Sequence, residues 1–377
     1  MPTNTSFQTP VLLIGNDPGS SAATEAVGAM AQKLASFIGE AKKSLHVAIY
    51  DFQLQDAAAA QLVVGAFKKA ASDGKEVLIA FDHTKSGSKK AKGGGEDDPA
   101  LRGTLGFVTQ NLPDSGRLRT KPIAGDHLMH DKYIIRDGGT PDAAVWMGSA
   151  NFTDGAWSLQ ENNVLIIQSK ELAARYEEDF QDLWQSGNIK KTGVNDYEEL
   201  QVGGDSVEFA FAPGEGSAAA SLFVDAIQGA EGETIMLSTM VLSSGPILGA
   251  LIDHLAKKGR IVGVYDATQM KGVVNDWRKS SSPKATQWRQ IQPLLIGKPS
   301  TPFNAKSDHD FMHNKVLVTD HVVVTGSFNL SQNAESNAEN AISIHDKSLA
   351  KAYQDYVQSL VKFGKKNWQP RTGRGSK

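Results

Sequence analysis

The side chains best suited to chemistry occur in two short, matching segments of this chain. Both read His-x-Lys-x-x-x-x-Asp, and their defining residues are His130, Lys132, Asp137, His313, Lys315 and Asp320. In a strand, residues i and i+2 lie on one face, so each segment presents an imidazole beside an ammonium group. A neutral imidazole can attack phosphorus, and a second imidazole can protonate the leaving oxygen. The pattern therefore predicts phosphodiester chemistry by two half-sites brought face to face.

Each segment is followed by a Gly-Ser-x-Asn tetrapeptide and, ten residues after its Asn, by a glutamate. These companions are Ser149, Asn151, Glu161, Ser327, Asn329 and Glu339. The two lysines and two asparagines would surround the non-bridging phosphoryl oxygens, where negative charge builds in the transition state. A glutamate on the far imidazole nitrogen would fix the histidine tautomer. The cationic side chains would supply the electrostatic stabilisation for which other enzymes use a metal.

The matching segments belong to a repeat of roughly 180 residues that spans most of the chain. The Glu161-Asn162 pair matches Glu339-Asn340 at an offset of 178 residues, and Phe81-Asp82 matches Tyr265-Asp266. Apolar periodicity fades near the middle of the chain. We therefore predict an N-terminal half at residues 1–190, a linker at 191–205 and a C-terminal half at 206–377.

Each half reads as strands alternating with helices. In the first half we expect strands at residues 44–52, 76–82, 130–136, 144–147 and 164–168, and helices at 33–41, 56–72 and 169–184. The strand at 76–82 is apolar throughout, as a sheet covered on both faces requires. The predicted fold class is α/β, with two copies of an α/β/α sandwich whose mixed sheets are flanked by helices.

Composition narrows the kinds of site that the chain can hold. The 377 residues contain no cysteine, which excludes disulfides, zinc–thiolate sites and a cysteine nucleophile. The net charge of −3 argues against a globally basic nucleic-acid binder, although a local basic groove stays open. His127 has no partner carboxylate at ligand spacing, so we predict no metal site and no cofactor.

The two His-x-Lys motifs with their Gly-Ser-x-Asn companions resemble the phospholipase D superfamily of phosphodiesterases. The resemblance implies a bilobal fold with the active site at a pseudo-twofold interface and a covalent phosphohistidine. It further implies that His130 is the nucleophile and His313 the general acid, although pseudo-symmetry permits the reverse. Asp137 and Asp320 are then structural at strand ends, and Ser149 and Ser327 are supporting. A single chain carries both motifs, so a monomer suffices and a homodimer stays possible.

The substrate class is predicted from the basic loops that should rim this site. We assign substrate binding to Lys89, Lys90, Lys271, Arg278 and Trp277. Basic side chains with an aromatic neighbour suit a nucleic-acid backbone with stacked bases, and the second motif resembles that of bacterial endonucleases of this superfamily. We therefore expect a nuclease acting on DNA or RNA. The alternatives are a phospholipase D or transphosphatidylase, a non-catalytic phosphate-binding module, and loops that are merely solvated.

No apolar run approaches the length of a membrane helix, and the first ten residues lack the layout of a signal peptide. We expect a cytoplasmic protein, with a trimmed secreted form as the alternative.

Overall fold

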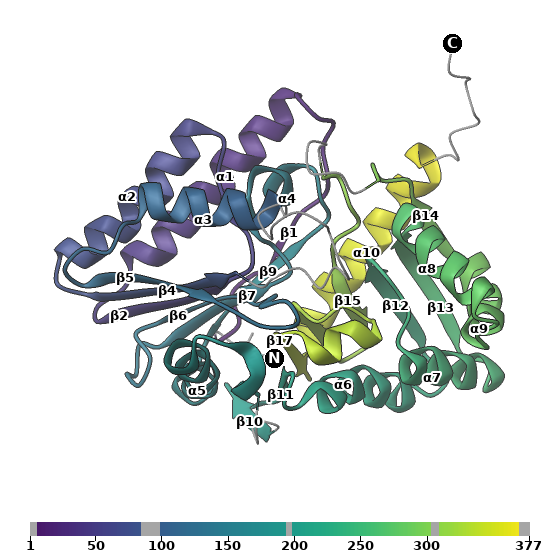
Figure 1. Cartoon of the computed structure of the whole chain (residues 1–377). Helices are drawn as coiled ribbons and strands as arrows, with labels where there is room; N and C mark the ends of the chain where they lie inside the picture. Colours follow the sequence, from purple (N-terminus) through teal and green to yellow (C-terminus); the bar gives the residue numbers. More distant parts are fainter. Residues whose placement is uncertain (1–5, 84–98, 194–197, 303–308, 369–377) are drawn as a thin grey trace, which may run out of the picture.

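The computed structural model describes residues 6–83, 99–193, 198–302 and 309–368. Two large mixed sheets stand side by side in it, each built by one half of the chain (Figure 1). The first sheet has the strand order β1 (Val11–Leu12), β9 (Asn163–Gln168), β7 (Ala144–Gly148), β6 (Lys132–Arg136), β2 (Ser44–Ile49), β4 (Glu76–Asp82), β5 (Leu118–Ile123). The second has the order β10 (Glu198–Val202), β11 (Asp205–Ala212), β17 (Glu339–Ile344), β16 (Val323–Gly326), β15 (Lys315–Val318), β12 (Thr234–Thr239), β13 (Arg260–Asp266), β14 (Leu295–Lys298).

The two sheets repeat one topology. In the first, β2, β4 and β5 pair in parallel and β6, β7 and β9 antiparallel. In the second, β12, β13 and β14 pair in parallel and β15, β16 and β17 antiparallel. The predicted duplication and α/β class are therefore confirmed. Strand β10 falls within residues 191–205, which the sequence had set aside as linker.

Helices cover both faces of each sheet. They are α1 (Ser21–Gly39), α2 (Ala57–Ser72), α3 (Pro99–Asn111), α4 (Asp154–Ser158), α5 (Lys170–Ser186), α6 (Gly216–Gly229), α7 (Gly245–Ala256), α8 (Ala267–Lys279), α9 (Lys284–Ile291) and α10 (Lys347–Asn367). A two-stranded sheet joins β3 (Phe52–Gln53) to β8 (Phe152–Thr153). Helices α1 and α2 lie on the outer side of the first sheet and α6 and α7 on that of the second (Figure 1).

One apolar core joins the two halves. It contains residues of both sheets together with the buried faces of α5 and α10, including Tyr176 and Tyr353. These two tyrosines occupy equivalent places, and each hydroxyl reaches an asparagine of the opposite half, Asn340 at 3.4 Å and Asn163 at 3.1 Å. The halves therefore share a continuous interior, and groups at their interface are held in a fixed relation.

Local sequence explains most element boundaries. Asp56 caps α2 by accepting from the Ala59 amide at 2.8 Å, and Ser169 caps α5 by accepting from Leu172 at 3.1 Å. Both helices lie where the sequence predicts them. The prediction for 33–41 was too short, because α1 begins at Ser21 and its first turns are rich in alanine and other small residues that give a weak amphipathic signal.

Candidate active site

The two motif histidines meet at the interface between the halves. His130 lies two residues before β6. Because β6 runs antiparallel to β2, His130 lies at the carboxyl end of β2, and His313 lies in the same way at the carboxyl end of β12. Their ring centroids are 6.4 Å apart with an interplanar angle of 68°. Each residue is 6% exposed. Two separate half-sites are thus combined into one buried pair of imidazoles.

Backbone contacts across the interface hold each histidine. The His130 amide donates to the carbonyl of Ala338 at 2.8 Å, and the His313 amide donates to the carbonyl of Glu161 at 3.1 Å. Since the partner of each histidine comes from the opposite half, the separation of the rings depends on how the halves dock.

Two aspartates that the sequence analysis did not select fix the loops before the histidines. Asp82 accepts from the Met129 amide at 2.7 Å, and Asp266 accepts from the Met312 amide at 3.0 Å. Both end a parallel strand and are buried. Their matching positions in the repeat could have identified them from the sequence. That match did not indicate which backbone groups they would bind.

The two imidazoles have different partners at Nδ1. Nδ1 of His130 lies 2.7 Å from Oε2 of Glu339, whereas Nδ1 of His313 lies 3.0 Å from Oδ1 of Asn162. The expectation that Glu339 orients a histidine agrees with this geometry, but the same expectation for Glu161 was wrong. A carboxylate faces one ring and a neutral amide faces the other.

The error came from aligning the repeat one residue out of register. Oγ of Ser149 accepts from the Asn163 amide and Oγ of Ser327 accepts from the Asn340 amide, both at 3.0 Å. Asn163 is therefore equivalent to Asn340, and Asn162 rather than Glu161 is equivalent to Glu339. The dipeptide Glu-Asn occurs in both halves, but at positions that are not equivalent. Only the strand register shows which of the two alignments is correct.

Glu161 instead forms a buried ion pair. Its Oε2 lies 2.6 Å from Nζ of Lys298, and its Oε1 accepts from the Gly15 amide at 3.2 Å. By strand register the equivalent positions of the pair are Ala338 and Ile123, both fully buried and apolar. The His313 side of the interface thus holds a charged pair where the His130 side holds an apolar one.

The motif lysines lie beside the histidines. Nζ of Lys132 donates to the His130 carbonyl at 2.6 Å and lies 5.1 Å from the Tyr50 ring centroid, and Nζ of Lys315 donates to the His313 carbonyl. Burial lowers the pKa of Lys132 to about 8 and the pKa of Lys315 well below its usual value. The ring of Tyr50 also packs 4.9 Å from that of His130.

Burial sets the protonation of the imidazoles and of Glu339. It is the main cause that holds the pKa of His130 and of His313 well below 6.5, and the two lysines add to it. Burial also raises the pKa of Glu339 to about 7, against the opposing effect of Lys132. Both imidazoles are therefore neutral near pH 7 in the free protein, which leaves a ring nitrogen able to attack.

The Gly-Ser-x-Asn tetrapeptides lie beside the histidines, since the backbone of Ser327 contacts His130 and that of Ser149 contacts His313. Asn151 and Asn329 each have a buried Oδ1 without a hydrogen-bond partner among the described residues. A buried amide group without a hydrogen-bond partner costs free energy unless a ligand provides the missing hydrogen bond. Rotation of the side-chain amide can present either its oxygen or its nitrogen to such a ligand. Ser149 and Ser327 use their hydroxyls within the fold, as the contacts to Asn163 and Asn340 show.

Asp137 and Asp320 lie away from the histidines. Asp137 follows β6 at the end opposite His130, about 23 Å along the chain at the usual rise of an extended strand. Its carboxylate accepts from the amides of Lys42, Lys43 and Ser44 at 2.5–3.1 Å. Asp320 accepts from Gln354 at 3.0 Å on the surface. Both positions fit the structural role that we expected and not direct contact with a phosphate.

The residues predicted to bind substrate in basic loops are only partly supported. Lys89 and Lys90 lie outside the described residues. Lys271 and Arg278 are exposed on α8. Trp277 is 9% exposed and belongs to the outer core of the second half, so its assignment as a stacking platform was wrong. An aromatic residue in a basic segment packed inward because α8 is amphipathic and needs a buried face.

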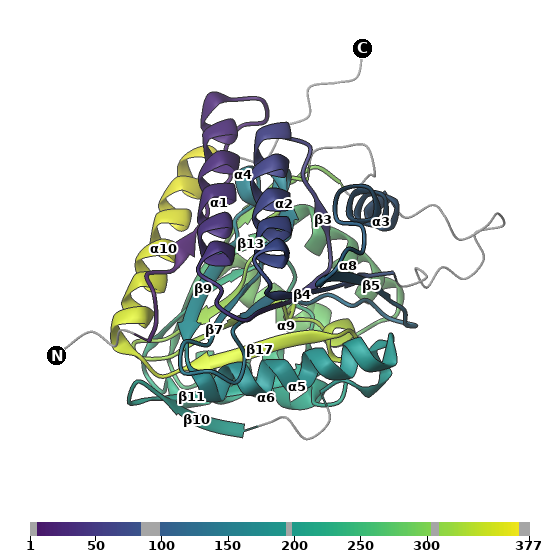
Figure 2. The same cartoon turned by 90° about the vertical axis from the view of Figure 1, so that its left-hand side faces the viewer.

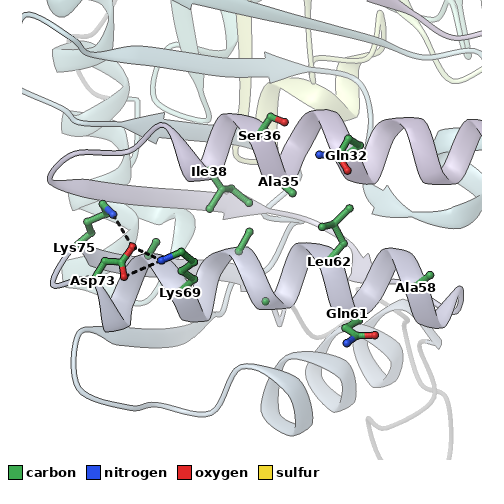
Figure 3. Close-up of a pocket in the computed structure, with 14 residues that line it drawn as sticks. Gln32, Ala35, Ser36, Ile38, Ala58, Gln61, Leu62, Lys69, Asp73 and Lys75 are labelled. Carbon is green, nitrogen blue, oxygen red and sulfur yellow. Dashed lines mark hydrogen bonds and ion pairs between the residues drawn. The ribbon is translucent and has the colours of Figure 1, made fainter.

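A separate apolar groove lies between α1 and α2 on the outer side of the first half (Figure 3). Ala35, Ile38 and Leu62 line it, and Lys69 and Lys75 at one end both contact the Asp73 carboxylate. Its lining includes none of the motif residues. Within the described ranges no group of three or more histidine, aspartate or glutamate side chains is placed to hold a metal ion, and no helix could span a bilayer.

Comparisons with known proteins agree with this geometry. A family model described as "Cardiolipin synthase, PLD-like domain" matches residues 34–184 and 223–361. The phospholipase D of Rickettsia prowazekii (strain Madrid E) is 29% identical over 171 residues, which cover 45% of this chain and 74% of that protein. The phospholipase D of Rickettsia bellii (strain RML369-C) is 29% identical over 174 residues, covering 45% and 77%.

The crystal structure of phosphatidylserine synthase from Haemophilus influenzae Rd KW20 superposes with a TM-score of 0.63 at 14% identity. The superposition covers 96% of this chain and 89% of that one. At this identity the likeness concerns the fold, and it extends over both halves.

Proposed function

The chain belongs to the phospholipase D superfamily of phosphodiesterases, and from that premise we propose that it cleaves phospholipid headgroups through a covalent phosphohistidine, with His130 as nucleophile and His313 as proton donor. The observation that carries this proposal is the difference between the Nδ1 partners of the two histidines.

The first step forms one bond and breaks one. Nε2 of His130 attacks phosphorus while its Nδ1–H donates to Glu339. The bond from phosphorus to the leaving oxygen breaks, and His313 gives that oxygen a proton. An anionic phosphodiester between the rings raises the pKa of His313, because it offsets the positive charge of the two lysines, so this histidine takes up a proton from the solvent as the substrate binds.

The second step reverses the roles at His313. Water, or an alcohol in a transfer reaction, gives its proton to His313 as its oxygen attacks phosphorus. The bond between Nε2 of His130 and phosphorus then breaks, and the neutral imidazole returns. Both steps conserve protons without another acid or base.

Glu339 suits the nucleophile because N-phosphorylation makes the His130 ring cationic. A carboxylate 2.7 Å from Nδ1 stabilises that cation. Asn162 accepts a hydrogen bond from His313 without adding negative charge, so His313 releases its proton more readily. The assignment of roles by pseudo-symmetry alone left both orders open, and the different partners favour this one.

Lys132, Lys315, Asn151 and Asn329 would bind the non-bridging oxygens. Buried cations and amide donors stabilise the charge that develops on these oxygens more strongly than solvated groups do. We propose that this electrostatic arrangement allows turnover without a metal ion.

Phospholipid is the proposed substrate class for two reasons. The curated relatives are named phospholipase D. In addition, the aromatic residue on which the nucleic-acid prediction depended, Trp277, is buried in a core, as is the neighbouring Trp288. The exposed Lys271 and Arg278 can attract any polyanion and do not favour a nucleic acid over a lipid surface.

Parallel assays test the proposal. Purified protein would be given phosphatidylcholine vesicles with and without ethanol, single- and double-stranded DNA, and RNA, with the His130→Ala variant as control. We expect lipid turnover that survives EDTA, and transfer of the phosphatidyl group to ethanol. Nuclease activity without lipid turnover would overturn the substrate class, and loss of all turnover in EDTA would overturn the mechanism.

A further inference from the structure

We infer that the carboxyl-terminal end of α10 and the loop after β1 form a docking surface for an anionic lipid bilayer. The surface, called here the rim patch, consists of Ile14, Lys362, Phe363, Lys366 and Trp368. This inference rests on the proposed lipid substrate for its purpose, but its binding test does not depend on turnover.

The rim patch contains two exposed apolar side chains and a half-buried tryptophan. Ile14 is 39% exposed and Phe363 is 40% exposed, and these are two of the four large hydrophobic residues recorded as exposed within the described part of the chain. The ring of Phe363 packs edge-on to that of Trp368, with centroids 5.9 Å apart. Trp368 itself is half-buried against the central core, and a Phe beside a partly exposed Trp is typical of residues that enter the interface of a bilayer.

Two lysines flank Phe363 on α10. Lys362 and Lys366 are exposed on α10, and the helix has no acidic residue after Asp355. The one exposed acid close in sequence to Ile14 is Asp17. A lysine is attracted to an anionic membrane surface, and an apolar neighbour strengthens the binding by inserting into the bilayer.

The rim patch lies at the end of the molecule where the histidines lie. Gly364 of α10 lies against Ile296 of β14, and Trp368, four residues later, lies near Lys298 at the end of that strand. Because later residues of α10 meet later residues of β14, the helix and the strand run in the same direction there. Because β14 is parallel to β13, whose carboxyl end is next to the site, α10 ends on the side of the site. Figure 2 shows the end of α10 and the start of α1 at the same end of the molecule.

A chain of contacts joins the rim patch to the proton donor. Nζ of Lys298 lies 5.9 Å from the Trp368 ring centroid and 2.6 Å from Oε2 of Glu161. Glu161 also accepts from Gly15, beside Ile14, and precedes Asn162, the partner of His313. A bilayer bound to this patch would therefore present its headgroups within a few side chains of the reacting phosphorus.

The α1–α2 groove is the rival apolar surface and fits an anionic membrane less well. Leu62 is 37% exposed there, but Lys69 and Lys75 are bound to Asp73 at 2.9 and 3.2 Å. Their charge is thus partly neutralised within the protein. The groove also lies between α1 and α2, on the outer side of the first half (Figure 1), and none of its lining residues belongs to the two motifs.

Co-sedimentation with vesicles tests the rim patch in the full chain. The probe is phosphatidylcholine vesicles with or without phosphatidylglycerol, and the protein carries His130→Ala so that no lipid is consumed. Replacing Lys362→Glu, Phe363→Ala and Lys366→Glu together should weaken binding to the phosphatidylglycerol vesicles about tenfold or more. A matched control replaces Lys33→Glu, Leu62→Ala and Lys68→Glu on α1 and α2, and should bind as the parent does.

Activity separates this inference from the proposed function. In a chain with His130 intact, the rim-patch variant should lose hydrolysis of vesicle lipid while its turnover of soluble bis(p-nitrophenyl) phosphate stays at the parent level. Equal binding by the rim-patch variant and its parent, or an equal loss in the α1–α2 control, would overturn the docking surface. Vesicle binding that depends on the rim patch, with no lipid turnover by any variant, would retain the docking surface and reject the lipid substrate. Thermal unfolding of each variant checks that it folds.

Discussion

The two halves share a scaffold and differ in the residues behind their histidines. Both place a histidine at the carboxyl end of a parallel strand and fix the preceding loop with an aspartate, Asp82 or Asp266. They diverge at one equivalent position, which is Glu339 behind His130 and Asn162 behind His313. A duplicated site would begin with equal histidines. We propose that this difference in charge favours His130 as the nucleophile and His313 as the proton carrier.

A second difference lies one residue earlier in the chain. Glu161 pairs with Lys298 inside the protein, whereas the equivalent positions in the other half are the buried apolar residues Ala338 and Ile123. The charged pair is on the side of His313, the proposed proton donor. The asymmetry therefore extends from the imidazole partner to the packing that supports it, while the backbone register of the two halves stays the same.

The largest expected effect separates the two histidines. His130→Ala should lower turnover about 10⁴-fold or more on every phosphodiester, because no bond to phosphorus can form. His313→Ala should cost about 10²–10⁴-fold with an alkyl leaving group, and far less with bis(p-nitrophenyl) phosphate, whose leaving group needs no proton. Steady-state rates on the two substrates give the comparison. The roles of the histidines would be exchanged if His130→Ala were the variant that spared the activated substrate.

Exchanging the Nδ1 partners should have the next largest effect. Glu339→Gln removes the carboxylate behind the nucleophile and should lower turnover about 10²–10⁴-fold. Asn162→Asp adds a carboxylate behind His313, which raises the pKa of that imidazole, and should slow proton release about tenfold. Trapping of the phosphoenzyme measures the effect of Glu339→Gln, and the pH dependence of turnover measures the effect of Asn162→Asp. Equal losses in the two variants would show that the carboxylate and amide are interchangeable.

The pH profile should report the buried lysine beside His130. Its pKa of about 8 means that Lys132 loses its charge as the pH rises through that value, so kcat/KM should fall on the alkaline side of pH 8. A bound phosphodiester favours the charged lysine, so the fall in kcat should come at higher pH. Lys132→Arg should move the alkaline limb upward, because arginine stays protonated. An alkaline limb that does not move in this variant would assign it to another group.

The buried pair Glu161–Lys298 should have the smallest effect on turnover and a clear one on stability. Lys298→Met leaves a buried carboxylate alone and should lower the free energy of unfolding by about 3–5 kcal/mol. The double variant Glu161→Ala, Lys298→Ile copies the apolar pair of the other side and should recover most of that loss. Urea unfolding measures both. A double variant as unstable as the single one would show that the site cannot accept the apolar arrangement of its counterpart.

The sequence predicted the repeat and the paired motifs because both are local patterns. The spacing of His130 and Lys132 on one strand, and the same spacing at His313, follows from the geometry of a strand. Caps such as Asp56 and Ser169 are equally local, and the helices that they begin lie where the sequence placed them. The domain boundaries stay predictions, as do the roles of the site residues other than Glu161 and Trp277.

The sequence failed where a partner comes from the opposite half. Glu161 and Asn162 are neighbours, and only the register of β9 against the Ser149 turn decides which of them faces His313. Lys298 reads as one more charge in a basic segment, but its partner is 137 residues away in the other half. Trp277 reads as an exposed aromatic, but the buried face of α8 decides its place.

The sequence by itself determined the chemistry that this chain can perform, because two imidazoles and two ammonium groups at fixed spacing are written in its order of residues. The sequence also predicted that these groups share one site, but the tertiary structure alone decided that a carboxylate supports one imidazole and an amide the other. The physical reason is that the electrostatic environment of a buried ring is set by the groups within a few ångströms of it. The docking of the two halves brings those groups together, and local sequence does not specify that docking.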